Sequence, residues 1–146
     1  MLQLVIHGGA GSLEGKNTEA KSIHQSLCKI WEDTFEILKK KSAKEAVING
    51  IRLLEDDPVF NAGTGSKLQA DGQVRMSAAL MDGFKNRFSG VINVQNIRFP
   101  IEAAALLSKS KNTVLSADQA TEYCRNHGFG EYNPVTSARI QEYEQK

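Results

Sequence analysis

The sequence lacks the residue patterns that most directly assign a function. Its 146 residues include only two cysteines, Cys28 and Cys124, which form no paired-cysteine metal motif. We expect both to be buried free thiols in a reducing compartment. No apolar run is long enough to cross a membrane, and the chain opens on a strand pattern instead of a signal peptide. These absences predict a cytoplasmic protein that spans no membrane.

A marked excess of one charge sign is also absent. The 18 basic and 17 acidic residues leave a formal net charge of +1. Bulk electrostatics therefore favours neither a nucleic acid nor an acidic membrane surface as a partner. The densest basic run, Lys39–Lys41, follows an apolar periodic segment. For this run we favour the C-terminus of a helix over a binding patch.

Complete catalytic signatures are missing as well. The chain has no G-x-S-x-G nucleophile elbow, no H-E-x-x-H zinc motif and no phosphate loop ending in Gly-Lys-Ser/Thr. Only His7, His24 and His127 offer an imidazole base. A nucleophile, a base and an orienting group must meet in space. The residues of this chain therefore predict no complete active site by themselves.

The first part of the chain contains clear secondary-structure patterns. Alternating apolar residues over Leu2–Ile6 predict a strand, and apolar spacings of three and four predict a helix over 18–40. Ser42 and Glu45 match a capping box, which opens a second helix reaching position 54. One strand followed by two helices is therefore expected before the middle of the chain.

Turn signals and strand patterns dominate the middle, and helices return afterwards. The expected elements are strands at 67–70 and 73–81 around the Asp71-Gly72 turn, strands at 88–94 and 113–115, a helix from Pro100 to 107, a helix from a capping box at Ser116–Gln119 to a stop at Gly128, and a helical tail. This order predicts one α+β domain over 1–146, with helices packed on an antiparallel sheet. Residues 135–146 carry few apolar groups, which predicts a loose C-terminal tail.

Two glycine-containing loops are the candidate functional segments. The first, His7–Gly11, is compatible with a tight strand-to-helix turn or with a ligand-binding loop, and His7 with a structural or a catalytic histidine. The second, Leu54–Gly65, follows a helix-like run. Its Asn61 can bond its own backbone, and its acids can be surface charges at a helix end. Acids and unpaired carbonyls at a helix C-terminus also suit a cation.

The motifs resemble the α subunit of plant-type L-asparaginases, also called isoaspartyl peptidases or β-aspartyl-peptidases, within the N-terminal nucleophile hydrolases. The resemblance rests on Ile6–Gly11, on Leu53–Glu55 leading into Pro58–Gly65, on Ala78–Gly83, and on the spacing between these blocks. It covers residues 2–108 well and the rest loosely. It implies that the chain is half of a four-layer αββα sandwich, which a β subunit completes.

The resemblance also implies how the active enzyme forms. A precursor cuts itself before a threonine, and that threonine becomes the nucleophile at the start of the β subunit. Two αβ pairs then form an (αβ)2 heterotetramer. The nucleophile therefore lies on the partner, Asn61 supports it, and the loop of His7, Gly8 and Gly9 lies against the cleavage junction. The loose tail at 135–146 is expected to lead to that junction.

A structural sodium ion is the one cofactor that the resemblance implies. Mainly backbone carbonyls would hold it, from the positions Leu54, Glu55, Asp57, Phe60, Ala62 and Thr64. The expected reaction needs no further cofactor: it releases L-aspartate from L-asparagine or from an isoaspartyl dipeptide. The sequence does not decide between these substrates. Ser77 departs from the family, whose members often carry Asp there, so the effect of Ser77 is open.

Two alternatives remain beside this interpretation. A glycosylasparaginase-like subunit belongs to the same superfamily, but its relatives usually begin with a Trp-containing motif where this chain has His7-Gly8-Gly9. A non-catalytic domain that binds a small molecule or an anion through the two glycine loops is the second alternative. The absence of a phosphate-loop lysine argues against it.

Overall fold

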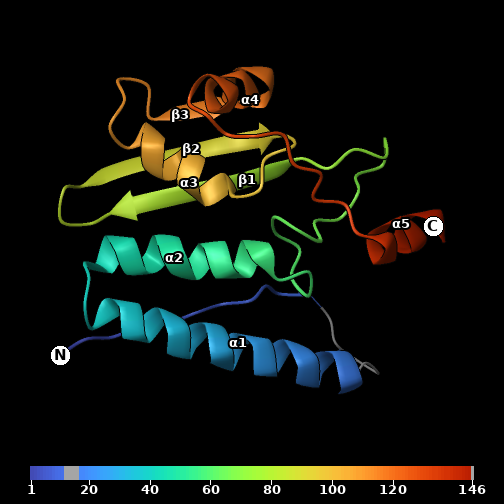
Figure 1. Cartoon of the computed structure of the whole chain (residues 1–146), viewed down its shortest axis with the longest axis horizontal. Coiled ribbons are helices and arrows are strands. Elements are labelled where there is room, and N and C mark those ends of the chain that lie inside the picture. Colours follow the sequence, from blue (N-terminus) through green and yellow to red (C-terminus); the bar gives the residue numbers. More distant parts are fainter. Residues whose placement is uncertain (12–16, 146) are drawn as a thin grey trace.

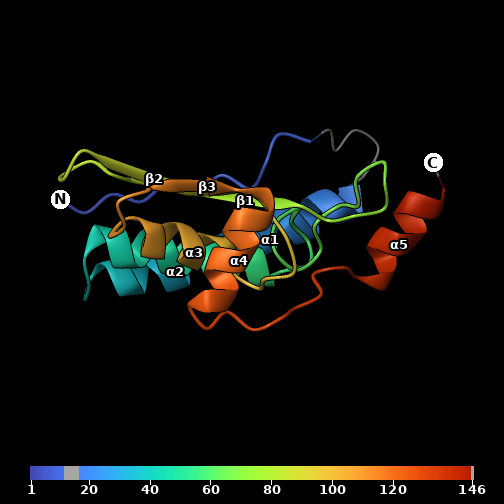
Figure 2. The same cartoon turned by 90° about the horizontal axis from the view of Figure 1, so that it is seen from above.

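A computed structural model describes residues 1–11 and 17–145, and it shows an α+β fold with one small sheet (Figure 1). The sheet has three strands in the order β1-β2-β3. Helices α2, α3 and α4 lie on one side of the strands (Figure 2). No helix within the described ranges is long and apolar enough to cross a membrane.

Helices α1 (Asn17–Leu38) and α2 (Ala43–Asp56) pack side by side (Figure 1). The predicted capping box at the start of α2 is confirmed: the Ser42 hydroxyl accepts the Glu45 N–H, and the Glu45 carboxylate accepts the Ser42 N–H. The two helices lie close together where Gly50 faces Thr34, since a Cβ on Gly50 would lie 2.9 Å from the Thr34 side chain. This pair forms the platform on which the candidate loops lie.

Strands β1 (Met76–Asp82) and β2 (Arg87–Val94) form the predicted antiparallel hairpin. Strand β3 (Val114–Ser116) pairs parallel to β2, so the prediction of a purely antiparallel sheet is wrong. The difference arises because α3 (Pro100–Leu107) carries the chain back across the sheet before β3 begins, and such a crossover delivers a parallel strand. Pro100 occupies the first turn of α3 as expected.

An irregularity interrupts the β1–β2 ladder near Ser77. The register shifts between Met76 and Ala78, and Asn93 on the facing strand has a φ of 55°. The Ser77 hydroxyl accepts the Asn93 N–H at 3.1 Å. Ser77 therefore satisfies a backbone donor that the bulge leaves outside the ladder.

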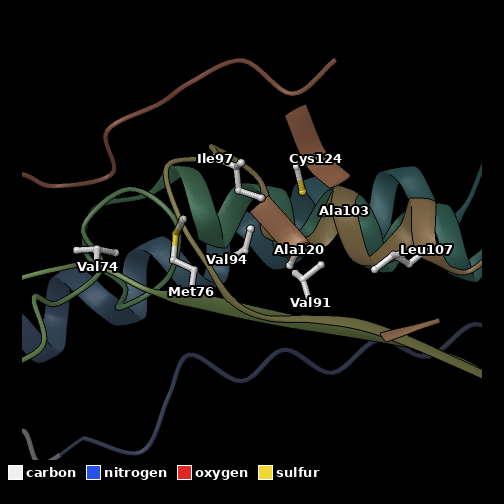
Figure 3. Packing of buried hydrophobic residues seen from close by; sticks show 9 residues of the cluster. All are labelled: Val74, Met76, Val91, Val94, Ile97, Ala103, Leu107, Ala120 and Cys124. Atoms are coloured by element: carbon white, nitrogen blue, oxygen red, sulfur yellow. The ribbon is translucent and has the colours of Figure 1, made fainter. Parts of the chain in front are cut away.

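The largest core cluster lies between the sheet and helices α3 and α4 (Ala117–Asn126), as Figure 3 shows. Its buried members are Val74, Met76, Val91, Val94, Ile97, Ala103, Leu107, Ala120 and Cys124. Cys124 is thus a buried free thiol as predicted, whereas Cys28 is exposed, so the prediction of two buried thiols is wrong for Cys28. Cys28 lies one turn from His24 on the outer surface of α1, with its sulfur 3.6 Å from the His24 Nε2 atom.

The ends of α4 differ in how well the sequence predicted them. Gly128 has a φ of 85°, and the Phe129 N–H bonds to the Cys124 carbonyl, so the predicted stop at Gly128 is confirmed. The predicted capping box at Ser116 is wrong, because the Ser116 side chain makes no capping hydrogen bond. Ser116 instead ends β3, and the positive φ of 51° at Ala117 turns the chain sharply into the helix.

Two predicted strands are not formed by the described residues. The segment Leu2–Ile6 has no strand neighbour and lies against α1, where the Trp31 indole N–H donates to the Leu4 carbonyl. Residues 67–70 also form no strand: the turn at Asp71-Gly72 exists, and its backbone hydrogen bonds run from the Gln69 N–H to the Gln73 carbonyl and from the Gly72 N–H to the Gln69 carbonyl. Both segments carry the alternation of a strand and lack a paired backbone beside them.

The C-terminal segment forms helix α5 (Ser137–Glu144), as its pattern predicted. It lies apart from the other helices, beside the chain that follows α2 (Figure 1). Its side chains form hydrogen bonds with Gly65, Lys67 and Ala70, and none of its residues is buried. Whether residues 135–146 behave as a loose tail in the assembled protein stays a prediction.

Candidate functional site

The site loop, residues 57–67, begins where α2 ends. Asp57 fixes the first turn of this loop. Its carboxylate accepts the Val59 N–H at 3.0 Å and also the hydroxyl of Ser26 on α1, and its backbone carbonyl accepts the Phe60 N–H at 3.1 Å. Phe60 is buried among the side chains of α1 and α2. The loop is therefore anchored to both helices before it reaches Asn61.

Two glycines allow the site loop to fold back on the end of α2. Gly63 has a φ of 53°, and a Cβ there would lie 2.1 Å from the Glu55 carbonyl oxygen. Gly65 has a φ of 88°, and a Cβ there would lie 2.6 Å from the Pro58 oxygen. The close approach lets the Thr64 N–H donate to the Glu55 carbonyl at 2.7 Å. No other residue type combines these backbone angles with such contacts.

Asn61 is exposed, and its orientation is fixed by one hydrogen bond. Its Oδ1 atom accepts the Lys67 N–H at 2.8 Å, so the side chain closes the loop on itself. The amide bonds the backbone six residues further along, and not its own backbone as one interpretation of the sequence held. With its oxygen engaged, Asn61 presents its NH2 group as a hydrogen-bond donor.

The structure brings the two predicted glycine loops together. A Cβ on Gly8 would lie 3.0 Å from Phe60 Cε1 and 3.1 Å from Leu27 Cδ1, so the His7–Gly11 segment packs directly on the start of the site loop. His7 is exposed, and its Nδ1 atom accepts the Gly9 N–H at 3.1 Å. In the tautomer that this bond requires, the proton is on Nε2. The contact between the two loops is thus made by Gly8 against Phe60, the residue before Asn61.

Glu55 does not belong to a frayed, solvated helix end. Its side chain is buried, with only 3% of the residue exposed, and its Oε1 atom accepts the Ile101 N–H at the start of α3. Burial raises the pKa of this carboxyl to about 8, although the Ile101 hydrogen bond opposes the shift. Its other oxygen has no partner among the described residues. Glu55 therefore links α2 to α3 through the Ile101 hydrogen bond, and its raised pKa favours the protonated carboxyl near pH 7.

Asp56 and Asp57, the other two acids, have different partners. Asp56 is exposed and forms a bidentate pair with Arg98, at 2.8 Å between Oδ1 and a guanidinium nitrogen. Asp57 is half-buried and caps the first turn of the site loop. None of the three acids faces a second carboxylate in a metal-binding cluster, and the described residues hold no group of three or more His, Cys, Asp or Glu that would bind a metal.

Backbone oxygens at the end of α2 suit a hard cation better than the acidic side chains do. Pro58 has no N–H, so the Leu54 carbonyl cannot receive the usual helical hydrogen bond from the fourth residue on. The Glu55 carbonyl already accepts the Thr64 N–H, but a carbonyl oxygen has a second lone pair. The chain returns to the Glu55 carbonyl at Gly63 and Thr64. Backbone carbonyls are ligands of the type that sodium or calcium prefers, and the further ligands Asp57, Phe60, Ala62 and Thr64 stay a prediction.

The sequence did not indicate the residues that hold the site loop from outside. Tyr132, Pro134 and Arg139 contact Thr64 and Gly65 through hydrogen bonds of 2.6–2.8 Å. These residues lie about seventy positions from the loop, so no local spacing reveals the contacts. One indirect indication of them is present in the sequence. The C-terminal segment has a helical pattern without an apolar face, so any contact it makes with the rest of the protein must be largely polar.

Comparison with known proteins places the sequence among asparaginases. Residues 1–146 match the family model Asparaginase_2, described as asparaginase. The chain is 47% identical over 146 residues to an isoaspartyl peptidase/L-asparaginase of Nostoc sp., and 46% identical over 144 residues to one of Synechocystis sp.. It is 36% identical over 149 aligned positions to a plant-type L-asparaginase of Pyrococcus horikoshii.

These alignments cover unequal shares of the two sequences. They include 97–99% of this chain but only 43–48% of the three relatives. The chain therefore spans about half the length of the curated relatives it matches.

Proposed function

Because this chain belongs to the Asparaginase_2 family of asparaginases, we propose that it is the α subunit of an amidohydrolase that cleaves isoaspartyl dipeptides and L-asparagine. The carrying observation is the contact between its two family motifs, since Gly8 packs on Phe60 next to Asn61. Segments more than fifty residues apart thereby form one surface. The names of the relatives support the proposed substrate class, and the contact between the two motifs supports the proposed site.

The nucleophile is proposed to be a threonine at the start of a β subunit, made when a longer precursor cuts itself. Two observations support this division. The relatives are about twice as long as this chain. Two of the three described imidazoles lie away from the glycine loops, since His24 is beside Cys28 on α1 and His127 is beside Tyr123 on α4, and the Nδ1 atom of the third, His7, accepts the Gly9 N–H. The surface around Asn61 thus has an oriented donor, and in this proposal the nucleophile that it supports comes from the second chain.

The reaction would proceed through an acyl intermediate. The threonine hydroxyl attacks the side-chain amide carbonyl of asparagine, or the β-linked carbonyl of an isoaspartyl dipeptide, while the threonine amino group takes the proton. Collapse of the tetrahedral species expels ammonia or an amino acid, and water then hydrolyses the ester to L-aspartate. The NH2 group of Asn61 would support the nucleophile by donating a hydrogen bond.

The uncovered face of the sheet supports a partner that adds further layers. Large apolar residues project from it although soluble sheets bury such faces. Met81 and Phe88 are cross-strand neighbours, with exposed fractions of 56% and 52%, and Ile92 and Val114 lie on the same face, at 47% and 40%. A β subunit whose own sheet covers this face would complete the four-layer αββα sandwich, and two such pairs would form an (αβ)2 heterotetramer.

The second alternative from the sequence, a domain that binds an anion through both glycine loops, receives no support from the geometry. Gly63 and Gly65 adopt positive φ to fold against the end of α2, and the Thr64 and Gly65 N–H groups are engaged by the Glu55 and Pro134 carbonyls. These amides are therefore not presented to a phosphate. A glycosylasparaginase-like activity differs in its substrate and is separated by assay.

The test is to express the full-length protein and measure both its chain composition and its activity. Intact-mass analysis should show this chain together with a second chain that begins with threonine, and the preparation should hydrolyse β-aspartyl dipeptides and asparagine. Glycosylated asparagine should be a poor substrate in the same assay. A fully active preparation that contains only this polypeptide would contradict the proposal.

A further inference from the structure

The segment 132–142, here called the clasp, runs from the end of the α4 region back over the site loop and into α5 (Figure 1). The Tyr132 hydroxyl is 2.8 Å from the Thr64 hydroxyl. The Pro134 carbonyl accepts the Gly65 N–H at 2.8 Å, and the Arg139 Nε–H donates to the Gly65 carbonyl at 2.6 Å. Both polar backbone groups of one glycine are thus held by the clasp.

Gly65 is a position where external restraint has a large effect. Its φ of 88° lies in a region that glycine reaches readily but that does not by itself select one loop conformation. Gly65 is buried, so its N–H and carbonyl would otherwise need solvent or other protein partners. The clasp provides both partners and removes this freedom.

Arg139 is itself held in one orientation. Its guanidinium donates to the Gly65 carbonyl through Nε and to the Glu142 carboxylate through another nitrogen at 2.7 Å. Glu142 also accepts from the Lys67 ammonium at 2.6 Å, and Lys67 is the last residue of the site loop. The planar guanidinium can serve both acceptors at once, whereas the single ammonium of a lysine would do so with poor geometry.

A short covalent path joins this contact to Asn61. The Gly65 carbonyl is two residues from the Lys67 N–H, and that N–H is the donor that orients the Asn61 side chain at 2.8 Å. A rotation of the Gly65 peptide would displace the Lys67 N–H and release the Asn61 amide. The Arg139 contact is therefore positioned to control where Asn61 points, although Arg139 is not part of the surface that Asn61 borders.

We propose that Arg139 is a positioning residue, which sets the orientation of Asn61 by fixing the Gly65 peptide from the clasp. The claim rests on the proposed function, in which Asn61 supports the nucleophile. Arg139 would contact neither substrate nor nucleophile. Its loss should lower the rate of the chemical step more than substrate binding, because a catalytic group displaced by about 1 Å can cost up to about a hundredfold in rate.

The experiment compares Arg139→Gln and Arg139→Lys with Arg87→Gln in the full-length protein. Arg87 is the matched control, because it also donates to a backbone carbonyl, that of Ser110 at 2.7 Å, but on a segment remote from the site loop. Amide hydrogen exchange of a peptide covering residues 59–70 is measured beside kcat and KM. Exchange reports on the loop even where the substrate is unknown, and the lysine variant retains the charge.

In Arg139→Gln we expect exchange in 59–70 to accelerate at least tenfold and kcat to fall by about tenfold or more, with KM changed less than threefold. Arg139→Lys should be intermediate, and Arg87→Gln should match the wild type in both. Unchanged exchange in 59–70, or equal losses of kcat in Arg139→Gln and Arg87→Gln, would overturn the proposal. A wild-type protein inactive on both substrates would instead refute the proposed function, while the exchange data would still decide whether the clasp holds the loop.

Discussion

The cluster beneath the sheet and the site loop are stabilised by different kinds of interaction. The cluster of Figure 3 consists of aliphatic side chains, the thioether of Met76 and the thiol of Cys124, packed between the strands, α3 and α4, and several of them have no exposed surface. The site loop buries Phe60 but takes its shape from two glycines and from hydrogen bonds to residues far away in the sequence. Apolar side chains can shift slightly and stay buried, whereas hydrogen bonds to the backbone of a loop hold that backbone in one conformation.

This difference separates two kinds of mutational effect. Changes in the cluster should lower the stability of the fold while leaving the shape of the surface around Asn61 intact. Changes in the site loop should alter that shape even where the rest of the fold persists.

The largest effect is expected for Gly63→Ala. The new Cβ would lie 2.1 Å from the Glu55 carbonyl oxygen at a φ of 53°, so the loop must leave α2. We expect a loss of more than about 3 kcal/mol in the free energy of unfolding, and the loss of nearly all activity in the folded fraction. Urea unfolding and a hydrolysis assay measure the two effects.

The matched control for this variant is Gly83→Ala in the β1–β2 turn. No atom lies within 4 Å of a Cβ built there, so this substitution should change the free energy of unfolding by less than about 1 kcal/mol. If the two alanine variants were equally stable and active, the site loop would not depend on the glycine conformation at 63.

Leu107→Ala in the cluster is expected to lower the stability of the fold strongly without changing the activity of the folded protein. Leu107 has no exposed surface, and truncation leaves a cavity that costs about 2–5 kcal/mol. The folded fraction should retain the wild-type kcat, because the site loop does not contact this residue. If the folded Leu107→Ala protein had a clearly lower kcat than the wild type, the cluster and the site loop would not be independent.

Removal of sodium should have a moderate effect on the site loop alone. If a sodium ion is held by carbonyls of Leu54, Glu55, Asp57, Phe60, Ala62 and Thr64, replacing it with a large organic cation should lower the stability by about 1 kcal/mol, or the melting temperature by about 3 °C. The activity should fall with it. No response of either quantity to the replacement, at equal ionic strength, would count against the site.

The smallest effect is expected for the ion pairs of the clasp. Hydrogen bonds from Lys67 and Arg139 lower the pKa of Glu142 to about 2. A carboxyl with a lowered pKa contributes stability above its unfolded pKa, and this contribution is lost as the pH falls toward the folded value. Because Glu142 is partly exposed, Glu142→Gln should cost less than about 1 kcal/mol at pH 6.

The difference in the free energy of unfolding between the wild type and Glu142→Gln should decrease as the pH falls from 4.5 to 2, because protonation of Glu142 removes the same charge from the wild type. Unfolding by urea at pH 6 and pH 3 measures both values, with Glu131→Gln as an exposed control expected to show little difference. A larger cost at pH 3 than at pH 6 would have the wrong sign for this ion-pair network.

The sequence predicted the elements whose causes are local. The two long helices follow from apolar spacing, the start of α2 from Ser42 and Glu45, and the β1–β2 hairpin from Asp82-Gly83 between alternating segments. The failures share a different cause. The segments Leu2–Ile6 and 67–70 carry strand patterns, but a strand needs a neighbouring backbone, which spacing along one chain cannot provide.

The candidate site was predictable in part for the same reason. The resemblance located both glycine loops, and the structure adds that Gly8 and Phe60 bring them together. The resemblance did not indicate the clasp, because Arg139 and Gly65 are far apart in the sequence and come together only in the tertiary fold. The burial of Glu55 was also missed, since three consecutive acids at the end of a helix pattern indicate a solvated end, and only the packing of α3 on Glu55 shows otherwise.

The central claim of the proposed function is that this chain provides the surface around Asn61 and that a second chain provides the nucleophile. The most direct test is to quench the full-length enzyme with acid during turnover of a β-aspartyl dipeptide and to determine the mass of each chain. The account predicts an aspartyl adduct on the N-terminal residue of the second chain and none on residues 1–146. An adduct on this chain would contradict it.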